Sequence, residues 1–222
     1  MKKIIKDTLV LFVITLIAGL LLGGVYKITK SPIEAQAKAK TEKAYKAVFQ
    51  KYYEKVADAE GAADSIVSAM TFDEWSEESL SALSTGFTSE LGDNTANTLD
   101  AVVTAYGSDG NVAGYVISAS SGDGMDGEIT MSVGMAADGT VIGISFTVLN
   151  ETAGLGSLVG EDAFKGQFNG VKTDKFTLFK SGGASAPGEI NGVSGATISS
   201  SAVVNAVNAA VDFFENDIQG GN

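Results

Sequence analysis

Two runs rich in β-branched residues flank a short polar turn in residues 99–118, LDAVVTAYGSDGNVAGYVIS. The runs Leu99–Tyr106 and Val112–Ser118 have the composition of strands. Between them, residues 107–110 supply the Gly and Asp that tight turns favour. This stretch therefore predicts a β-hairpin.

The same design follows immediately along the chain. Residues 129–135 and 141–149 are again rich in β-branched and apolar residues, and Asp138 and Gly139 lie between them. Two successive hairpins predict an antiparallel sheet.

Helical patterns surround these hairpins. Residues 161–168 predict a short helix and residues 176–179 a further strand. A final helix is expected over 197–216, because apolar residues recur there at helical spacing and form a stripe that can pack on the sheet. The stripe consists of Val203, Val207, Val211 and Phe214. The predicted fold class is α+β.

Upstream of the hairpins the sequence predicts mostly helix. Ser31 and Pro32 have the residue types of an N-cap and a first helical position, so a helix is expected from there to about Tyr53. Residues 56–97 are acidic and weakly periodic, with short helices expected around 65–70 and 74–83.

The N-terminal segment predicts a membrane anchor. No residue from Thr8 to Tyr26 is charged, and about 20 apolar residues are needed to cross a bilayer as a helix. A cleaved signal peptide is the alternative, but its apolar region is shorter and ends at a small-residue site. We favour a retained helix in contact with lipid through residues 8–28. The lysines before it favour a cytoplasmic N-terminus and an extracytoplasmic body.

Composition excludes several kinds of chemistry. The chain has no Cys and no His, so it lacks the residues for an iron–sulfur cluster, a structural zinc site or a Ser–His triad. Any redox chemistry therefore needs an organic cofactor. Residues 1–55 carry a net charge of +7 and residues 56–222 carry −19, a balance that disfavours nucleic acid as a partner.

Two glycine-rich stretches are candidates for a binding site, residues 151–156 (ETAGLG) and residues 191–197 (NGVSGAT). The second leads directly into the predicted last helix, and a helix N-terminus favours a phosphate. Gly195 and Ala196 leave room for a phosphate, and Thr197 adds a hydroxyl. Ser and Thr before a helix are also common as simple caps.

Three other interpretations stay open at this stage. Asp123, Asp126 and Glu128 carry oxygen ligands suited to calcium, although their spacing fits no complete EF-hand. Glu151 and Asp126 could form the carboxylate pair of a hydrolase. An apolar N-terminal helix before a Gly- and Thr-rich β body is also found in pilin-like surface proteins, which usually have a processing glycine before the helix. None occurs in residues 1–8.

Several ordered motifs together resemble a known family. They are the residues 114–116 (GYV), 124–129 (GMDGEI), 133–134 (VG), 138–139 (DG) and 142–144 (IGI), followed by the two glycine-rich stretches. This series resembles the FMN-binding domain shared by the G subunit of the Rnf complex and the C subunit of the sodium-translocating NADH:quinone oxidoreductase. The resemblance covers about residues 98–216.

The resemblance implies a covalent cofactor. In that family a flavin transferase of the ApbE type uses magnesium and FAD to attach FMN to the last residue of D-x-x-[ST]-G-A-[ST], which is Thr197 here. Nine residues are thereby implied in cofactor binding: Thr197, Ser194, Gly195, Ala196, Glu151, Thr152, Gly154, Leu155 and Gly156. Three positions depart from the family pattern: Asn191 replaces the leading Asp, Ala153 replaces a Pro, and Asp126 lies in a stretch usually richer in glycine.

The expected organisation has three parts: an anchor (1–30), a helical connecting region (31–97) and an FMN-binding domain (98–222). The resemblance implies an electron-transfer subunit of an ion-translocating ferredoxin:NAD oxidoreductase, with the C subunit of the quinone reductase as the alternative. The implied partners are the membrane subunits of the complex and the flavin transferase.

Overall fold

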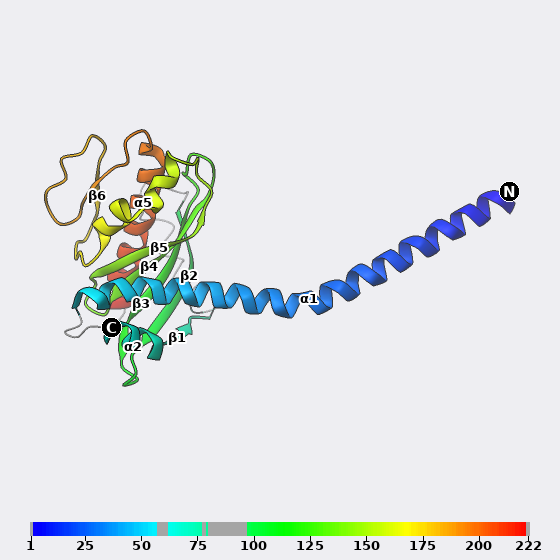
Figure 1. Ribbon diagram of the computed structural model, residues 1–222, viewed down its shortest axis with the longest axis horizontal. Coiled ribbons are helices and arrows are strands. Elements are labelled where there is room, and N and C mark those ends of the chain that lie inside the picture. The colour runs from blue at the N-terminus through cyan, green and yellow to red at the C-terminus, as the bar shows by residue number, and fades with distance from the viewer. Residues whose placement is uncertain (1, 57–61, 77–78, 80–96, 221–222) are drawn as a thin grey trace. The chain divides into compact units, whose positions relative to one another are not determined.

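The computed structural model describes residues 2–56, 62–76, 79 and 97–220 of the 222-residue chain. Its elements are coloured from blue to red along the chain in Figure 1. The chain divides into two compact units, residues 1–42 and residues 43–222.

The first unit belongs to helix α1 (Lys2–Val56). Every residue of the segment Leu11–Ile33 is exposed, and with a mean hydropathy of 2.1 the segment is long and apolar enough to cross a membrane. The expected helix start at Ser31 is wrong, because Pro32 lies inside α1. A proline removes one backbone hydrogen bond, but the Ala-, Lys- and Glu-rich residues that follow are strong helix formers.

The second unit is built on a five-stranded antiparallel sheet with the strands in sequence order, which confirms the predicted hairpins. The strands are β1 (Thr71–Glu74), β2 (Asn97–Tyr106), β3 (Val112–Ser121), β4 (Ile129–Ala136) and β5 (Val141–Leu149). Strand β1 pairs with the end of β2 and was not predicted. Glu74 ends this strand, so the helix expected to start there is wrong at its first residue; most of 75–83 lies outside the described residues.

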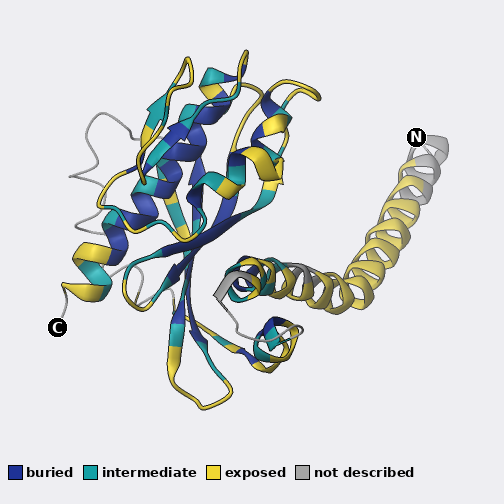
Figure 2. Cartoon of the chain, turned by 60° about the vertical axis from the view of Figure 1, so that its left-hand side comes forward, coloured by how far each residue is buried: buried dark blue, intermediate teal, exposed yellow. Residues whose placement is uncertain are grey.

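Helix α5 (Thr197–Phe213) packs on one face of the sheet, as the α+β prediction required. The four residues of the predicted stripe are all buried, and they pack with Ile117, Met131 and Val133 of the sheet. Figure 2 shows the buried residues of this helix and of the neighbouring strands in dark blue. The chain continues from α5 into a π-helical segment, Phe214–Gln219.

A second, smaller core covers the opposite face of the sheet. Tyr45, Val48 and Phe49 from the last turns of α1 pack there with helix α2 (Ala62–Ala69). Helix α2 confirms the short helix expected around residues 65–70.

A run of short elements connects β5 to α5. These are the 3-10 helix η1 (Gly156–Gly160), helix α4 (Asp162–Lys165), the 3-10 helix η2 (Gly166–Phe168), and strands β6 (Thr177–Phe179) and β7 (Glu189–Asn191). Strands β6 and β7 form a small parallel sheet. The helix expected over 161–168 is thus divided into α4 and η2, and β7 was not predicted.

Candidate functional site

A cavity of about 370 Å³ lies at the start of α5. Its volume is within the usual range of small-molecule sites. It brings together the two glycine-rich stretches that the sequence singled out. The lining residues are Met125, Asp126, Glu151, Thr152, Leu155, Gly156, Gly195, Ala196, Thr197, Ile198 and Ser199.

Thr197 is the first residue of α5 and is half-buried in the cavity wall. The residue before it, Ala196, is the N-cap, and no side chain caps the helix by a hydrogen bond. Among the described residues, none forms a hydrogen bond with the Thr197 hydroxyl. Thr197 is therefore not a simple helix cap, and its hydroxyl is available at the cavity.

The backbone around Thr197 favours an anion. The N–H of Ser200 donates to the Ala196 carbonyl at 2.9 Å and makes the first backbone hydrogen bond of α5. The N–H groups of residues 197–199 precede it and have no acceptor within the helix. All three residues line the cavity. Unpaired N–H groups and the positive end of the helix dipole are the features that bind phosphate.

The two glycine-rich stretches meet at this helix start. Gly195 has a φ of +79°, which turns the chain into α5. A Cβ atom placed on Gly195 would lie 3.6 Å from Cδ2 of Leu155, in ordinary contact. The 191–197 stretch therefore supplies the Thr197 hydroxyl, and the 151–156 stretch supplies the apolar side chain of Leu155.

Glu151 joins three segments of the wall. Its Oε1 accepts a hydrogen bond from the N–H of Met125 at 2.8 Å, and its Oε2 accepts one from the Ser199 hydroxyl at 2.9 Å. The N–H of Asp126 lies 3.5 Å from the same Oε1. Because its oxygens are held in this way, Glu151 fixes the 124–126 loop against the first turn of α5.

Asp126 lies at the exposed side of the cavity, where its Oδ2 accepts a hydrogen bond from the Thr152 hydroxyl. The structure thus brings Glu151 and Asp126 to one cavity, as the hydrolase interpretation needs. Both carboxylates are engaged with protein donors, which describes a wall better than an acid–base pair. The three candidate calcium ligands do not cluster: no group of three or more acidic side chains suited to a metal occurs among the described residues.

The mouth of the cavity is apolar and open to solvent. Met125, Leu155 and Ile198 are 64%, 49% and 52% exposed, although they are large hydrophobic residues. All three line the cavity. A cluster of exposed apolar side chains around a cavity marks a surface that a ligand or partner covers. A planar aromatic group fits this chemistry.

Seven of the nine predicted site residues line this cavity, and Ser194 and Gly154 do not. Ser194 is exposed, and the N–H of Gly154 donates to the Ser157 hydroxyl at 3.0 Å. The sequence reasoning missed Met125, Ile198 and Ser199. A second hydroxyl in the first helical turn after a Gly-rich loop was a usable signal for Ser199; an isolated exposed Met or Ile offers none.

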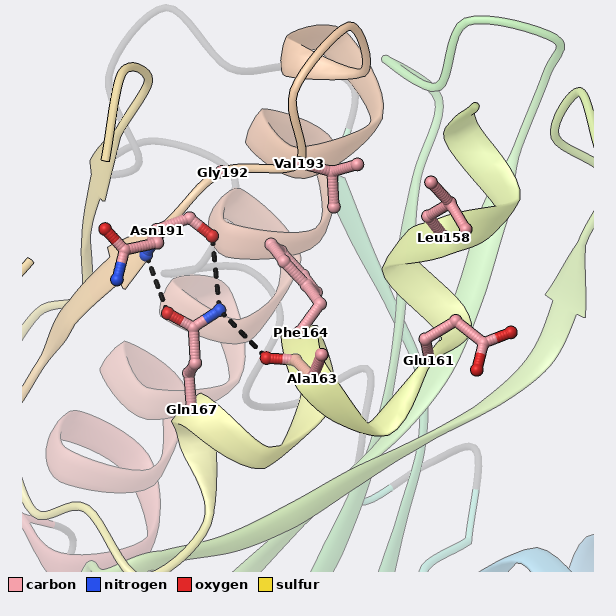
Figure 3. Close-up of a pocket in the computed structure, with 8 residues that line it drawn as sticks. All are labelled: Leu158, Glu161, Ala163, Phe164, Gln167, Asn191, Gly192 and Val193. Atoms are coloured by element: carbon pink, nitrogen blue, oxygen red, sulfur yellow. Dashed lines mark hydrogen bonds between the residues drawn. The ribbon is translucent and has the colours of Figure 1, made fainter. Parts of the chain in front are cut away.

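A second cavity, of about 530 Å³, lies beside the segment that leads to Thr197. Figure 3 shows its lining, which includes Leu158, Phe164 and Val193. The side-chain amide of Gln167 pairs with the main chain of Asn191: its Oε1 accepts from the Asn191 N–H at 2.7 Å, and its Nε2 donates to the Asn191 carbonyl at 3.1 Å. Gln167 therefore fixes the start of the NGVSGAT stretch.

The Asn191 side chain is directed to a different neighbour, because its Oδ1 accepts from the N–H of Ala184 at 3.0 Å. A carboxylate at position 191 would accept the same hydrogen bond, so this departure from the family pattern leaves the loop anchored. Glu189, two residues earlier in the chain, also accepts backbone hydrogen bonds from the 184–186 segment through its side chain. Hydrogen bonds from the N–H groups of Ser185 and Ala186 hold the pKa of Glu189 below its usual value.

Comparisons with known families identify the same region. Residues 124–212 match the family described as FMN-binding domain, and residues 1–48 match the RnfG N-terminal region. The first match contains every residue that lines the cavity at the start of α5.

The chain is also similar in sequence to subunits of ion-translocating complexes from several organisms. It is 30% identical to the G subunit of an ion-translocating oxidoreductase complex of Methanosarcina acetivorans, over 96% of this chain and 95% of that protein. It is 41% identical to the G subunit of a proton-translocating ferredoxin:NAD⁺ oxidoreductase complex of Clostridium ljungdahlii, over 44% of this chain and 51% of that protein. It is 32% identical to the G subunit of a sodium-translocating ferredoxin:NAD⁺ oxidoreductase complex of Acetobacterium woodii, over 49% of this chain and 53% of that protein.

Two solved structures share the fold. The C subunit of the sodium-translocating NADH-quinone reductase from Parabacteroides distasonis superposes with a TM-score of 0.52 at 16% identity, covering 82% of this chain and 95% of that one. NqrC of Shewanella oneidensis superposes with a TM-score of 0.56 at 18% identity, covering 83% of this chain and 98% of that one.

Proposed function

Because this chain belongs to the RnfG family of ion-translocating oxidoreductase complexes, we propose that it carries one FMN as a phosphoester on Thr197 and relays electrons within such a complex. The relatives from C. ljungdahlii and A. woodii are subunits of ferredoxin:NAD⁺ oxidoreductase complexes. We extend that activity to the complex that contains this chain. The alternative, the C subunit of the quinone reductase, is similar to it in fold alone.

The observation that carries the proposal is the Thr197 hydroxyl. It has no hydrogen bond to a described residue, it lines the cavity, and it begins a helix that no side chain caps. A phosphodiester at this position places one negative charge beside the unpaired N–H groups of residues 197–199, where the helix dipole stabilises it.

The remaining lining residues fit a flavin. Met125, Leu155 and Ile198 offer apolar contact to an isoalloxazine ring. Glu151 holds the loop that carries Met125 and the first turn of α5, which carries Ile198. Bound FMN accepts and donates one or two electrons, a chemistry that no side chain of this Cys- and His-free chain supplies. The protein's own contribution is to fix the phosphate and to hold apolar side chains against the ring.

A covalent bond is useful where a cofactor is open to dilution. A reversibly bound FMN dissociates when the free concentration falls below its Kd. We propose that the segment Leu11–Ile33 spans the membrane with the N-terminus in the cytoplasm, so that the FMN domain is extracytoplasmic and has no pool of free FMN beside it. The proposed partners are the membrane subunits of the complex and an ApbE-type flavin transferase.

The test is in-gel flavin fluorescence of the denatured protein, together with intact mass and peptide mapping of protein purified from its own host. We expect the mass of one FMN less water on the peptide that contains Thr197. Thr197→Ala should abolish the fluorescence, and Thr197→Ser should retain part of it because a hydroxyl survives.

Ser181→Ala is the matched control, since Ser181 is an exposed hydroxyl residue outside both the NGVSGAT motif and the cavity lining. It should leave the fluorescence unchanged. Undiminished fluorescence of Thr197→Ala would place the attachment elsewhere. A native protein that is colourless and unmodified would contradict the electron-carrier function and favour the structural, pilin-like alternative.

A further inference from the structure

The charge of the cavity lining is one-sided. Of the eleven described residues that line it, two are acidic, Asp126 and Glu151, and none is basic. The unit that contains the cavity is itself strongly acidic, because residues 56–222, which make up most of it, carry a net charge of −19. A group bound here is therefore surrounded by negative charge, apart from the helix N-terminus at the phosphate end.

The two carboxylates differ in how far protein donors compensate their charge. Glu151 accepts hydrogen bonds from the N–H of Met125 and from the Ser199 hydroxyl. It also lies beside the first turn of α5, whose dipole offsets negative charge. Asp126 accepts one hydrogen bond, from the neutral hydroxyl of Thr152, and lies on the loop rather than at a helix start. Asp126 is thus the less compensated charge at the mouth of the cavity.

A charge at this place acts on the two redox states of a flavin unequally. Two-electron reduction of the neutral oxidised ring takes up two electrons and one proton at N5, which leaves a ring of charge −1; a second proton at N1 neutralises it. A neighbouring carboxylate raises the free energy of the −1 product more than that of the neutral reactant. It therefore makes the ring harder to reduce.

We propose that the carboxylate of Asp126 lowers the midpoint potential of the flavin held in this cavity and so sets this protein for low-potential electron transfer. The inference rests on the proposed function, because it needs a flavin at Thr197. Its dependence on one exposed charge also predicts that the effect weakens as salt rises, since exposed charges are screened over roughly 8–10 Å at 0.1–0.15 M ionic strength.

Asp126→Asn tests this directly, because an amide oxygen can still accept the Thr152 hydrogen bond while the charge is lost. We expect the equilibrium constant for reduction to rise about tenfold, which is about 30 mV for a two-electron couple. Asp126→Ser should shift the potential in the same direction, and it serves if the Asn variant loads poorly. Asp123→Asn is the matched control: Asp123 is an exposed acid on the same loop, outside the cavity lining, and its replacement should leave the potential unchanged.

The measurement is a spectroelectrochemical titration of the full-length protein in detergent, with dithionite and redox mediators, at low and at high salt. Covalent loading is first confirmed by mass. If the loaded Asp126 variants have the wild-type potential at low salt, the inference is wrong and the proposed function stands. A shift of equal size in Asp123→Asn would also overturn it, since the effect would then come from net charge. If wild-type protein from its own host carries no flavin, the proposed function itself fails.

Discussion

At the residue scale, Gly156 is tightly packed against its neighbours in the cavity wall. A Cβ atom at this position would collide with the Glu151 carboxylate and would lie 2.7 Å from the Ser199 hydroxyl. Gly156→Ala should therefore push Glu151 away from Ser199, destabilise the fold by about 1–3 kcal/mol and reduce flavin loading. Denaturant unfolding and in-gel fluorescence measure the two effects.

Gly166→Ala is the control for that substitution. No atom lies within 4 Å of a Cβ placed at Gly166, and its φ of −61° suits any residue. It should leave both the free energy of unfolding and the loading unchanged, or slightly raise stability by restricting the unfolded chain. Equal free energies of unfolding for the two variants would contradict this, because Glu151 and Ser199 would then move aside without destabilising the fold.

The site residues that could be predicted from sequence are those with a local chemical signal. The stretches 151–156 and 191–197 were singled out because each is rich in glycine and the second leads into a helix, and the resemblance then implied Thr197 as the attachment residue; seven of the nine predicted residues line the cavity. Met125 reaches the same cavity only through the tertiary fold. The β4–β5 hairpin follows Met125 and leads back to Glu151, so no local pattern reports this proximity.

At the element scale, periodicity predicted the long hairpins and the buried stripe of α5, where many residues share one pattern. It identified the short helix α2 and the short strand β6, expected at residues 176–179, but it missed two other short strands that depend on distant partners. Strand β1 has four residues and exists through its pairing with β2, and β7 has three and pairs with β6. Pro32 misled because Ser31 and Pro32 were interpreted as the start of a second helix, whereas α1 continues through both residues.

Tyr45 gives the contact between the end of α1 and the sheet a pH dependence. Burial, followed by the charge of Glu74, raises the pKa of Tyr45 to about 12. The folded state therefore keeps the proton that the unfolded chain loses near pH 10. The stability from this group is fully present below pH 10 and is lost as pH rises towards 12, by about 2 kcal/mol.

Unfolding measured across this range, with tyrosinate absorbance to follow ionisation, checks the expectation. Tyr45→Phe should remove most of the fall in stability between about pH 10 and pH 12, because phenylalanine keeps the ring packing against Phe72 and has no proton to lose. Tyr52→Phe, at a half-buried position in the same helix, should leave the fall in place. An identical pH profile for the Tyr45 variant would assign the transition to another group.

At the scale of the whole molecule, lysines and exposed apolar residues are concentrated in the N-terminal part of the chain, before the FMN-binding domain. Eleven of the 15 lysines lie in residues 1–55, and no residue of the segment Leu11–Ile33 is buried. The first buried side chain among the described residues is Tyr45, which belongs to the second unit. The buried core of the described residues therefore begins at Tyr45 and includes none of residues 11–33.

Two truncations test this division. Protein that begins at residue 36 should be soluble without detergent, load flavin and unfold at the temperature of the full-length chain, because it keeps Tyr45, Val48 and Phe49. Protein that begins at residue 57 loses all three, at roughly 3 kcal/mol or more for each large side chain removed from a core. Since domains are stable by only about 5–15 kcal/mol, this second form should be largely unfolded.

Full-length protein should remain with the membrane fraction after an alkaline wash, whereas the form that begins at residue 36 should not. Release of full-length protein as a shortened chain would identify the apolar segment as a cleaved signal instead of an anchor.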